Sequence, residues 1–196
     1  MGDCEQVIRE LDALVQGWIS VHQRATSTAS TMCNLHEQSE KTLPLLPQAR
    51  SLELLLAMQQ EKIEQSKKAL WKAAQEYGGV VRSMDQLHAR VGKMELASPA
   101  DHLEAVAGIT PAYAKRVVAD RREAYTGEYL RRVDLIQGLL IKGELGIREF
   151  TQEWMESKVD YAVEEEYLER LRLARLARQW QSNQEAAEAA SAMASL

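Results

Sequence analysis

An all-α fold is what the sequence predicts, and two observations carry the prediction. Every long segment repeats its apolar positions at helical spacing, and none shows the alternation and hairpin turns of paired strands. The 196 residues are 45% hydrophobic, which is enough for a real core. We expect an elongated antiparallel helical bundle with coiled-coil character and about four long helices. It should comprise residues 1–180 with an elbow near 97–110, followed by a flexible tail over 181–196.

The first helix is expected to run from about Asp3 to Glu40. The Ser/Thr-rich stretch 26–31 is its weakest part, because hydroxyl side chains compete for backbone hydrogen bonds, so we expect a kink or fraying there. Pro44 and Pro47 then break the chain, and Ser51 is a candidate cap for the next helix.

The second helix is the longest and carries a heptad repeat. Apolar residues return every seven positions from Leu56 to Val91, and a companion seam runs from Gln59 to Met94. A continuous helix over 52–95 would be roughly 65 Å long. Gly78 and Gly79 each cost about 1 kcal/mol against Ala inside a helix, so they indicate either a kink or the close approach of another backbone.

A short helix and then a basic helix follow. Residues 98–101 (Ser-Pro-Ala-Asp) have the composition of a helix start, and Gly108 ends the short helix that forms the elbow. Thr110 and Pro111 combine an N-cap hydroxyl with the residue suited to the first helical position, so the long helix that contains Ala114 to Lys142 begins there. One face is apolar and the other is charged with a positive bias, which is typical of a docking surface or of a solvated face.

Gly143 and Gly146 mark a turn before the fourth helix, which should carry Ile147, Trp154 and Leu168. Its end places arginines around a leucine stripe: Arg170, Arg172, Arg175 and Arg178. The tail that follows is rich in Ala, Ser and Glu, which favours flexibility.

Composition and motifs exclude several classes of function. The sequence has no Gly-rich phosphate loop, no HExxH, no cysteine pair at zinc spacing and no recognisable nucleophile, so we expect neither enzymatic activity nor a cofactor. Cys33 and His36 share a helical face, but a structural zinc site needs four ligands, so no metal is expected. With Cys4 the only other cysteine, no disulfide framework is predicted.

The charge balance and hydropathy bear on partners and location. A net charge of −5, from 24 basic and 29 acidic residues, argues against bare nucleic acid as the main partner. No apolar run approaches the ~20 residues of a membrane span, and Gln6 stands where a myristoylation signal needs Ser or Thr. We expect a soluble intracellular protein with no membrane partner and no direct specific binding of nucleic acid.

Three groups of residues resemble one family in their order and spacing. They are Trp18 followed by Asn-Leu-x-Glu-Gln at 34–38; Tyr125-x-x-x-Tyr129-Leu-Arg-Arg leading into Leu135; and Ile147 followed by Trp154. The arrangement is similar to the family of the AIRIM ribosome maturation factor, a small helical protein once described as a casein-kinase-type substrate. The stretch from Val80 to Val91 also resembles that family's second helix, so the similarity covers most of residues 11–156. The Arg-Leu helix and Ala-rich tail differ from the family, so nothing is carried over there.

The resemblance implies a non-catalytic adaptor for paired type II AAA ATPases of the Afg/Spata kind, bound together with a second small helical adaptor. Such a complex extracts a shuttling assembly factor from the large-subunit ribosome precursor, which is therefore an indirect partner. It also supports replication-linked protein turnover, so cytoplasm and nucleus are the expected locations.

Two other classes of function stay open. The heptads by themselves predict a coiled-coil subunit of a tethering, cytoskeletal or kinetochore complex. The basic residues of 115–132 and 170–178 are compatible with an RNA- or DNA-binding module.

The candidate partner-binding residues lie on the basic helix and in the motifs around it: Trp18, Tyr125, Tyr129, Arg131, Arg132 and Trp154. Aromatic residues at helical spacing fill a bundle interior more often than they contact a partner, by roughly two to one. Arg131 and Arg132 are the better interface candidates, because Arg beside aromatic residues is enriched in binding hot spots. A solvated face is an equally good interpretation of the two arginines.

Overall fold

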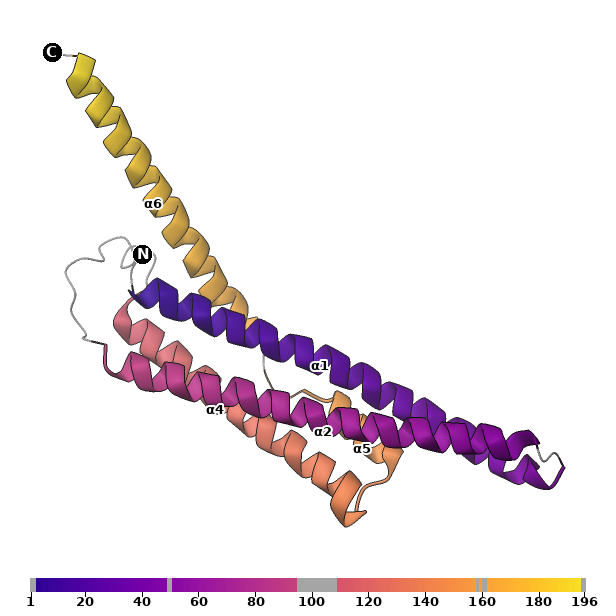
Figure 1. Cartoon of the computed structure of the whole chain (residues 1–196). Helices are drawn as coiled ribbons and strands as arrows, with labels where there is room; N and C mark the ends of the chain where they lie inside the picture. The colour runs from indigo at the N-terminus through magenta and orange to yellow at the C-terminus, as the bar shows by residue number, and fades with distance from the viewer. Residues whose placement is uncertain (1–2, 49–50, 95–108, 158, 160–161, 195–196) are drawn as a thin grey trace. The chain divides into compact units, whose positions relative to one another are not determined.

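The computed structural model describes residues 3–48, 51–94, 109–157, 159 and 162–194. Every regular element in these residues is helical (Figure 1), which confirms the all-α prediction. The elements are α1 (Asp3–Thr42), the 3₁₀ helix η1 (Leu43–Gln48), α2 (Ser51–Gly92), α4 (Pro111–Gln137), the π-helical segment η2 (Gly138–Lys142), α5 (Ile147–Met155) and α6 (Ala162–Ala194). None of the helices in the described part is both long and apolar enough to cross a membrane.

The helices form two compact units. The first is built from the described parts of 1–14, 84–122 and 160–196, and the second from those of 15–83 and 123–159. The second unit contains all six candidate partner-binding residues. The predicted elbow near 97–110 lies almost entirely outside the described residues.

Helix α1 is continuous through the Ser/Thr-rich stretch where a kink or fraying was expected. The hydroxyls of Thr28, Ser30 and Thr31 donate to backbone carbonyls four residues earlier, at 2.9, 3.0 and 2.9 Å. These side chains thus bond within the helix and do not break it. Ala29 and Met32 are fully buried on the same turns, so packing holds the helix where propensity is weak.

Helix α2 buries the seam that the heptads predict. Along that seam the exposed fraction does not exceed 7% at five successive heptad positions, namely Ile63, Leu70, Tyr77, Met84 and Val91. These side chains are covered by the chain's own helices. The repeat therefore builds this protein's core.

Helix α2 is unbroken at Gly78, where the sequence indicated either a kink or the close approach of another backbone. A Cβ atom at this position would lie 3.0 Å from the hydroxyl oxygen of Tyr129. The glycine thus admits a tyrosine side chain from α4, where the sequence suggested the approach of another backbone. Its neighbour Gly79 is half-buried and has no such close contact.

Helix α4 begins as predicted, with Thr110 as its cap. The backbone N–H of Tyr113 donates to the Thr110 hydroxyl at 3.1 Å, which satisfies one of the free amides of the first turn. The last turn of this segment widens into η2, which ends where Gly143 adopts φ 65°. An L-residue with a side chain rarely adopts that conformation, so the glycine sets the turn toward α5.

Replacing Thr110 by alanine should lower the free energy of unfolding by about 1 kcal/mol, because the amide of Tyr113 loses its acceptor. Chemical denaturation followed by circular dichroism measures this change. Thr110→Ser keeps the acceptor and should stay near the wild type. Equal losses in both variants would show that the cap contributes nothing.

The fourth predicted helix is two helices, which corrects the sequence-based boundaries. α5 ends at Met155, and Glu156 has the extended dihedral angles φ −71° and ψ 116°. The final helix α6 then runs to Ala194 without a break at residue 181. The predicted tail 181–196 is thus helical over its described residues.

Candidate functional site

Trp18 occupies the centre of an aromatic cluster in the second unit. Its ring centroid lies 4.2 Å from that of Tyr77 on α2 and 4.9 Å from that of Tyr125 on α4. The ring planes of Trp18 and Tyr125 make an angle of 84°. Trp154 on α5 lies 6.3 Å from Tyr77 and stacks on Phe150 at 5.3 Å. All five side chains are fully buried. The cluster joins four helices through edge and tilted ring contacts, the arrangements that aromatic pairs prefer.

Arg132 is buried completely within this cluster. Its guanidinium carbon lies 4.6 Å from the centroid of the Trp154 ring and 5.4 Å from that of Tyr77. A cation at this distance from a ring face is attracted by the ring quadrupole, and more strongly where water is excluded. The guanidinium also donates to the carbonyl of Trp154 at 3.4 Å. Arg132 on α4 thus contacts both α2 and α5 in the interior of the second unit.

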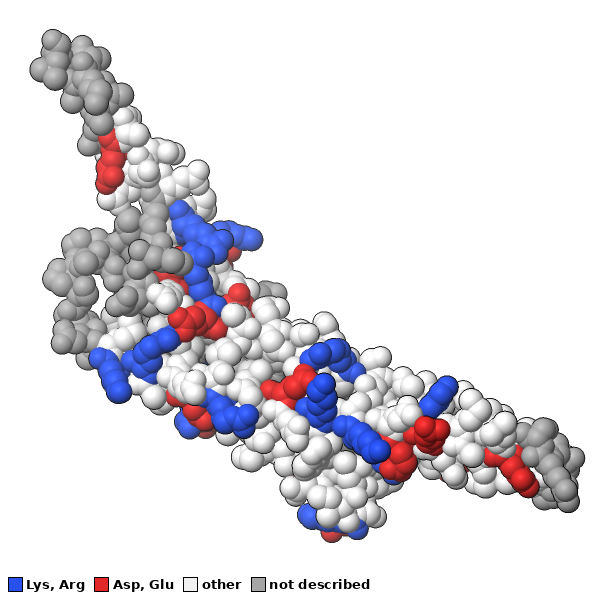
Figure 2. All heavy atoms as spheres, in the orientation of Figure 1, with Lys and Arg blue, Asp and Glu red and all other residues white. Residues whose placement is uncertain are grey.

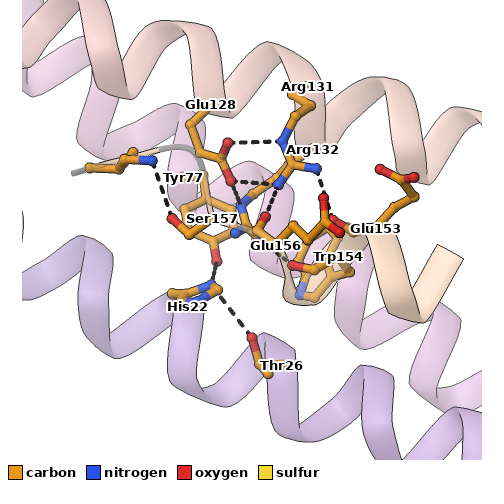
Figure 3. Close-up of polar contacts among 11 residues, drawn as sticks. His22, Thr26, Tyr77, Glu128, Arg131, Arg132, Glu153, Trp154, Glu156 and Ser157 are labelled. Carbon is orange, nitrogen blue, oxygen red and sulfur yellow. Dashed lines mark hydrogen bonds and ion pairs between the residues drawn. The ribbon is translucent and has the colours of Figure 1, made fainter. Parts of the chain in front are cut away.

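The charge of Arg132 is balanced by Glu128, one helical turn earlier (Figure 3). The Oε1 atom of Glu128 lies 2.8 Å from Arg132 Nε, in an ion pair that is not aligned as a hydrogen bond. The same carboxylate accepts two hydrogen bonds from Arg131, at 2.8 and 2.9 Å. Glu128 is itself 2% exposed, so one buried carboxylate serves two arginines.

Arg131 closes the end of α5. Its guanidinium donates to the carbonyl oxygens of Glu153, at 2.8 Å, and of Glu156. Carbonyls at the end of a helix have no partner within the helix, and a cation there also complements the helix dipole. The carboxylate of Glu128 raises the pKa of Arg131 and holds the side chain in its charged form. Arg131 therefore fixes the point at which the fourth predicted helix stops.

His22 lies at the edge of the cluster. Its Nδ1 atom is 3.5 Å from the hydroxyl oxygen of Tyr77 and 3.5 Å from that of Thr26 (Figure 3). Burial lowers the pKa of His22; the charges of Arg132 and Arg131 lower it further, against an opposing effect of Glu128. The folded protein thus binds the His22 proton less tightly than the unfolded chain does. Stability from this residue is present above the ordinary pKa of about 6.5 and is lost as pH falls below it.

We expect the wild type to lose more stability than His22→Gln when the pH falls from about 7.5 to about 5.5. Glutamine keeps a polar side chain but does not take up a proton in this range. Urea unfolding at several pH values measures the difference. Parallel pH profiles would show that His22 does not couple folding to protonation.

The six candidate residues meet in one unit, but they differ in exposure. Trp18, Tyr125, Arg132 and Trp154 are fully buried. The solvated face proposed for Arg132 is therefore wrong, and the core interpretation fits Trp18, Tyr125 and Trp154, while partner binding by the six residues stays a prediction. Tyr129 and Arg131 are half-buried, the first against Gly78 and the second against the end of α5.

Most of the other basic side chains predicted for the docking face of α4 contact groups within the chain, whereas Arg116 is exposed. Lys115 donates to the carbonyl of Met94 at 2.8 Å, Arg121 is 5% exposed, and Arg122 pairs with Asp85. Lys and Arg are interspersed with Asp and Glu on the face drawn in Figure 2. The positive bias of the sequence does not become a separate basic surface on this helix.

The described residues bring no set of metal ligands together. They contain no group of three or more His, Cys, Asp or Glu placed to hold a metal ion. His36 lies 3.6 Å from Glu40, and Cys33 is half-buried. Glu128, Arg131 and Arg132 form ion pairs and hydrogen bonds that hold α4 and α5 together.

Sequence reasoning missed the roles of Glu128, Tyr77 and His22. The spacing of Glu128 to Arg131 and Arg132, three and four residues, signals the ion pairs but gives no sign of burial. Tyr77 is predicted both as a heptad position and as a core aromatic residue, but its contacts with Arg132 and His22 are not. His22 carries no motif, because Tyr77, one of its two partners, comes from another helix.

No protein-family model, no curated protein and no solved structure matches this chain.

Proposed function

We propose that the protein is a non-catalytic adaptor subunit of an AAA ATPase complex that acts in maturation of the large ribosomal subunit and in extraction of proteins from assemblies. In this proposal the energy comes from ATPases of the Afg/Spata kind, and a second small helical adaptor completes the complex. The same complex would support replication-linked protein turnover, with activity in cytoplasm and nucleus. The family resemblance of residues 11–156 motivates these identities.

The observation that best supports an interaction subunit is the set of large apolar side chains left in solvent. On α2, Leu54, Leu55 and Met58 are 69%, 43% and 49% exposed within about one helical turn. On α6, Leu173, Leu176 and Trp180 are 48%, 56% and 69% exposed at spacings of three and four residues. Single exposed apolar residues are ordinary, but groups of them mark interaction surfaces. The polar groups around the buried cluster are meanwhile used within the chain. The exposed apolar side chains are therefore the surfaces on which we expect partner proteins to bind.

A coiled-coil structural subunit is the second candidate, and one observation favours it. The start of α2 exposes Leu54, Leu55 and Met58, which lie within about one helical turn of each other. The longer heptad seam argues the other way, because it is buried within the chain from Ile63 to Val91. A nucleic-acid module has less support, since Arg121 and Arg132 of α4 are buried and Arg122 and Arg131 are paired with carboxylates.

Native affinity purification of the tagged full chain, quantified by mass spectrometry, tests the proposal. We expect near-stoichiometric AAA ATPase subunits, a second small helical protein and ribosome assembly factors. A tagged helical protein of similar size is the control for non-specific recovery. Long coiled-coil proteins without an ATPase would replace the proposal by the second candidate.

A further inference from the structure

Helix α6 carries apolar side chains on two opposite faces. Leu171 and Ala174 are 5% and 0% exposed, whereas Leu173, Leu176 and Trp180 are 48%, 56% and 69% exposed. The last three are spaced by three and four residues and therefore form one stripe. At roughly 100° per residue, the centre of that stripe lies about 160° from the buried pair. The helix uses one face within its own unit and leaves the other in solvent.

The buried face is the one that attaches α6 to the first unit. The guanidinium of Arg170 lies 4.4 Å from the ring centroid of Tyr113 at the start of α4, and Arg116 lies 5.6 Å from the same ring. Ala174 lies on the same side of the helix, one turn further on. The attachment of α6 therefore leaves the Leu173, Leu176 and Trp180 stripe uncovered.

The surroundings of the exposed stripe are basic. The segment 170–180 contains four arginines and no acidic residue. Arg172 is 74% exposed at its side chain and lies 3.1 Å from Glu169, the acidic residue just before the segment. Arg175 is exposed and makes no ion pair among the described residues. At roughly 100° per residue, Arg172 lies on the edge of the stripe about 40° from Leu176, whereas Arg175 lies further round the helix.

We propose that the Leu173, Leu176 and Trp180 stripe binds an amphipathic helix of another protein whose apolar face is bordered by acidic residues. The apolar side chains would enter the interface, and Arg172 would meet a carboxylate along its edge. The inference rests on the proposed function only in taking the partner to be a protein. It does not depend on whether that protein is an ATPase.

A second copy of this chain fits the stripe poorly. An antiparallel pair that aligns the two apolar stripes brings together the arginine-rich segments 170–180 of both copies. Stripe-on-stripe pairing of two copies therefore sets arginine near arginine, whereas a helix bordered by acidic residues sets carboxylates near them, so an acidic partner is the better complement of the stripe.

The test uses the full chain and three labelled synthetic peptides, followed by fluorescence anisotropy. One is an amphipathic helix with leucines on one face and glutamates beside them; the second has lysines in place of the glutamates; the third has the acidic composition in scrambled order. We expect the acidic helix to bind at least about tenfold more tightly than either control, and less tightly at high salt. Equal binding of the acidic and basic helices would overturn the proposal.

Variants locate the binding site. The double substitution Leu176→Ser, Trp180→Ser should weaken binding of the acidic helix by about tenfold or more, because the apolar contacts supply most of the interface energy. Leu54→Ser is the matched control, because Leu54 is as exposed as Trp180 but lies in the other unit. Both residues face solvent, so both variants should fold. Equal weakening in the two variants would overturn the assignment to α6.

Analytical ultracentrifugation of the chain without peptide tests whether a second copy of the chain occupies the stripe. We expect a monomer whose mass does not change in the Leu176→Ser, Trp180→Ser variant. A dimer that this variant dissociates would assign the stripe to self-association and overturn the proposal. The peptide assay contains no ATPase, so its failure differs from a failure to recover an ATPase in the native purification.

Discussion

Replacing Arg132 by methionine should lower the free energy of unfolding by about 3–5 kcal/mol. Methionine has a similar length but no charge, so Glu128 would lose an ion-pair partner while it stays buried at 2% exposure. The cation–π contacts with Trp154 and Tyr77 would be lost at the same time. Urea denaturation followed by far-UV circular dichroism measures the change. We expect a large effect because burial leaves water little access to the remaining charge.

A second substitution separates the buried charge from packing. Glu128→Gln combined with Arg132→Met removes both buried charges. Arg131 loses its carboxylate partner in this variant but is half-buried and keeps its carbonyl acceptors, so we expect a measurable part of the stability lost in Arg132→Met to be recovered. Replacing both members of a buried pair is generally less harmful than removing one. A loss below about 1 kcal/mol in Arg132→Met would contradict the account, because it would give Arg132 the value of an exposed ion pair.

Truncating Trp18 to alanine should destabilise the protein by about 3–5 kcal/mol. The indole is fully buried and contacts Tyr77 and Tyr125, so its removal opens a cavity where α1, α2 and α4 meet. Trp18→Phe keeps part of the ring contacts and should lose less. The same denaturation experiment measures both variants.

Trp180→Ala is the matched control for this truncation. It removes the same side chain at a position that is 69% exposed, and surface substitutions of this kind usually change stability by no more than about 0.5 kcal/mol. Similar losses for Trp18→Ala and Trp180→Ala would show that the aromatic cluster is not the structural centre of the second unit.

Local sequence rules were enough for much of the fold. The heptad series predicted the buried face of α2, because a helix that covers a core must repeat its apolar residues with the helical period. The pair Thr110 and Pro111 predicted the start of α4, because cap chemistry depends on neighbouring residues alone. Gly143 and Gly146 likewise marked the turn before α5.

Features that depend on contacts between helices were not predictable in this way. Arg132 is adjacent to Arg131 in the sequence, yet one is buried between aromatic rings and the other is half-buried at the end of α5. The break after Met155 has no glycine or proline to announce it, and the carbonyl contacts of Arg131 come from a helix more than twenty residues earlier. The continuity of α1 through residues 26–31 likewise depends on tertiary burial of Ala29 and Met32.

The most direct test of the adaptor function is a release assay with cytoplasmic large-subunit ribosome precursors, purified AAA ATPase and ATP. The measured quantity is the amount of shuttling assembly factor released with and without this protein. We predict efficient release only when the protein and the ATPase are both present, and none when the protein is added alone. Release by the ATPase at the same rate in the absence of the protein would contradict the account.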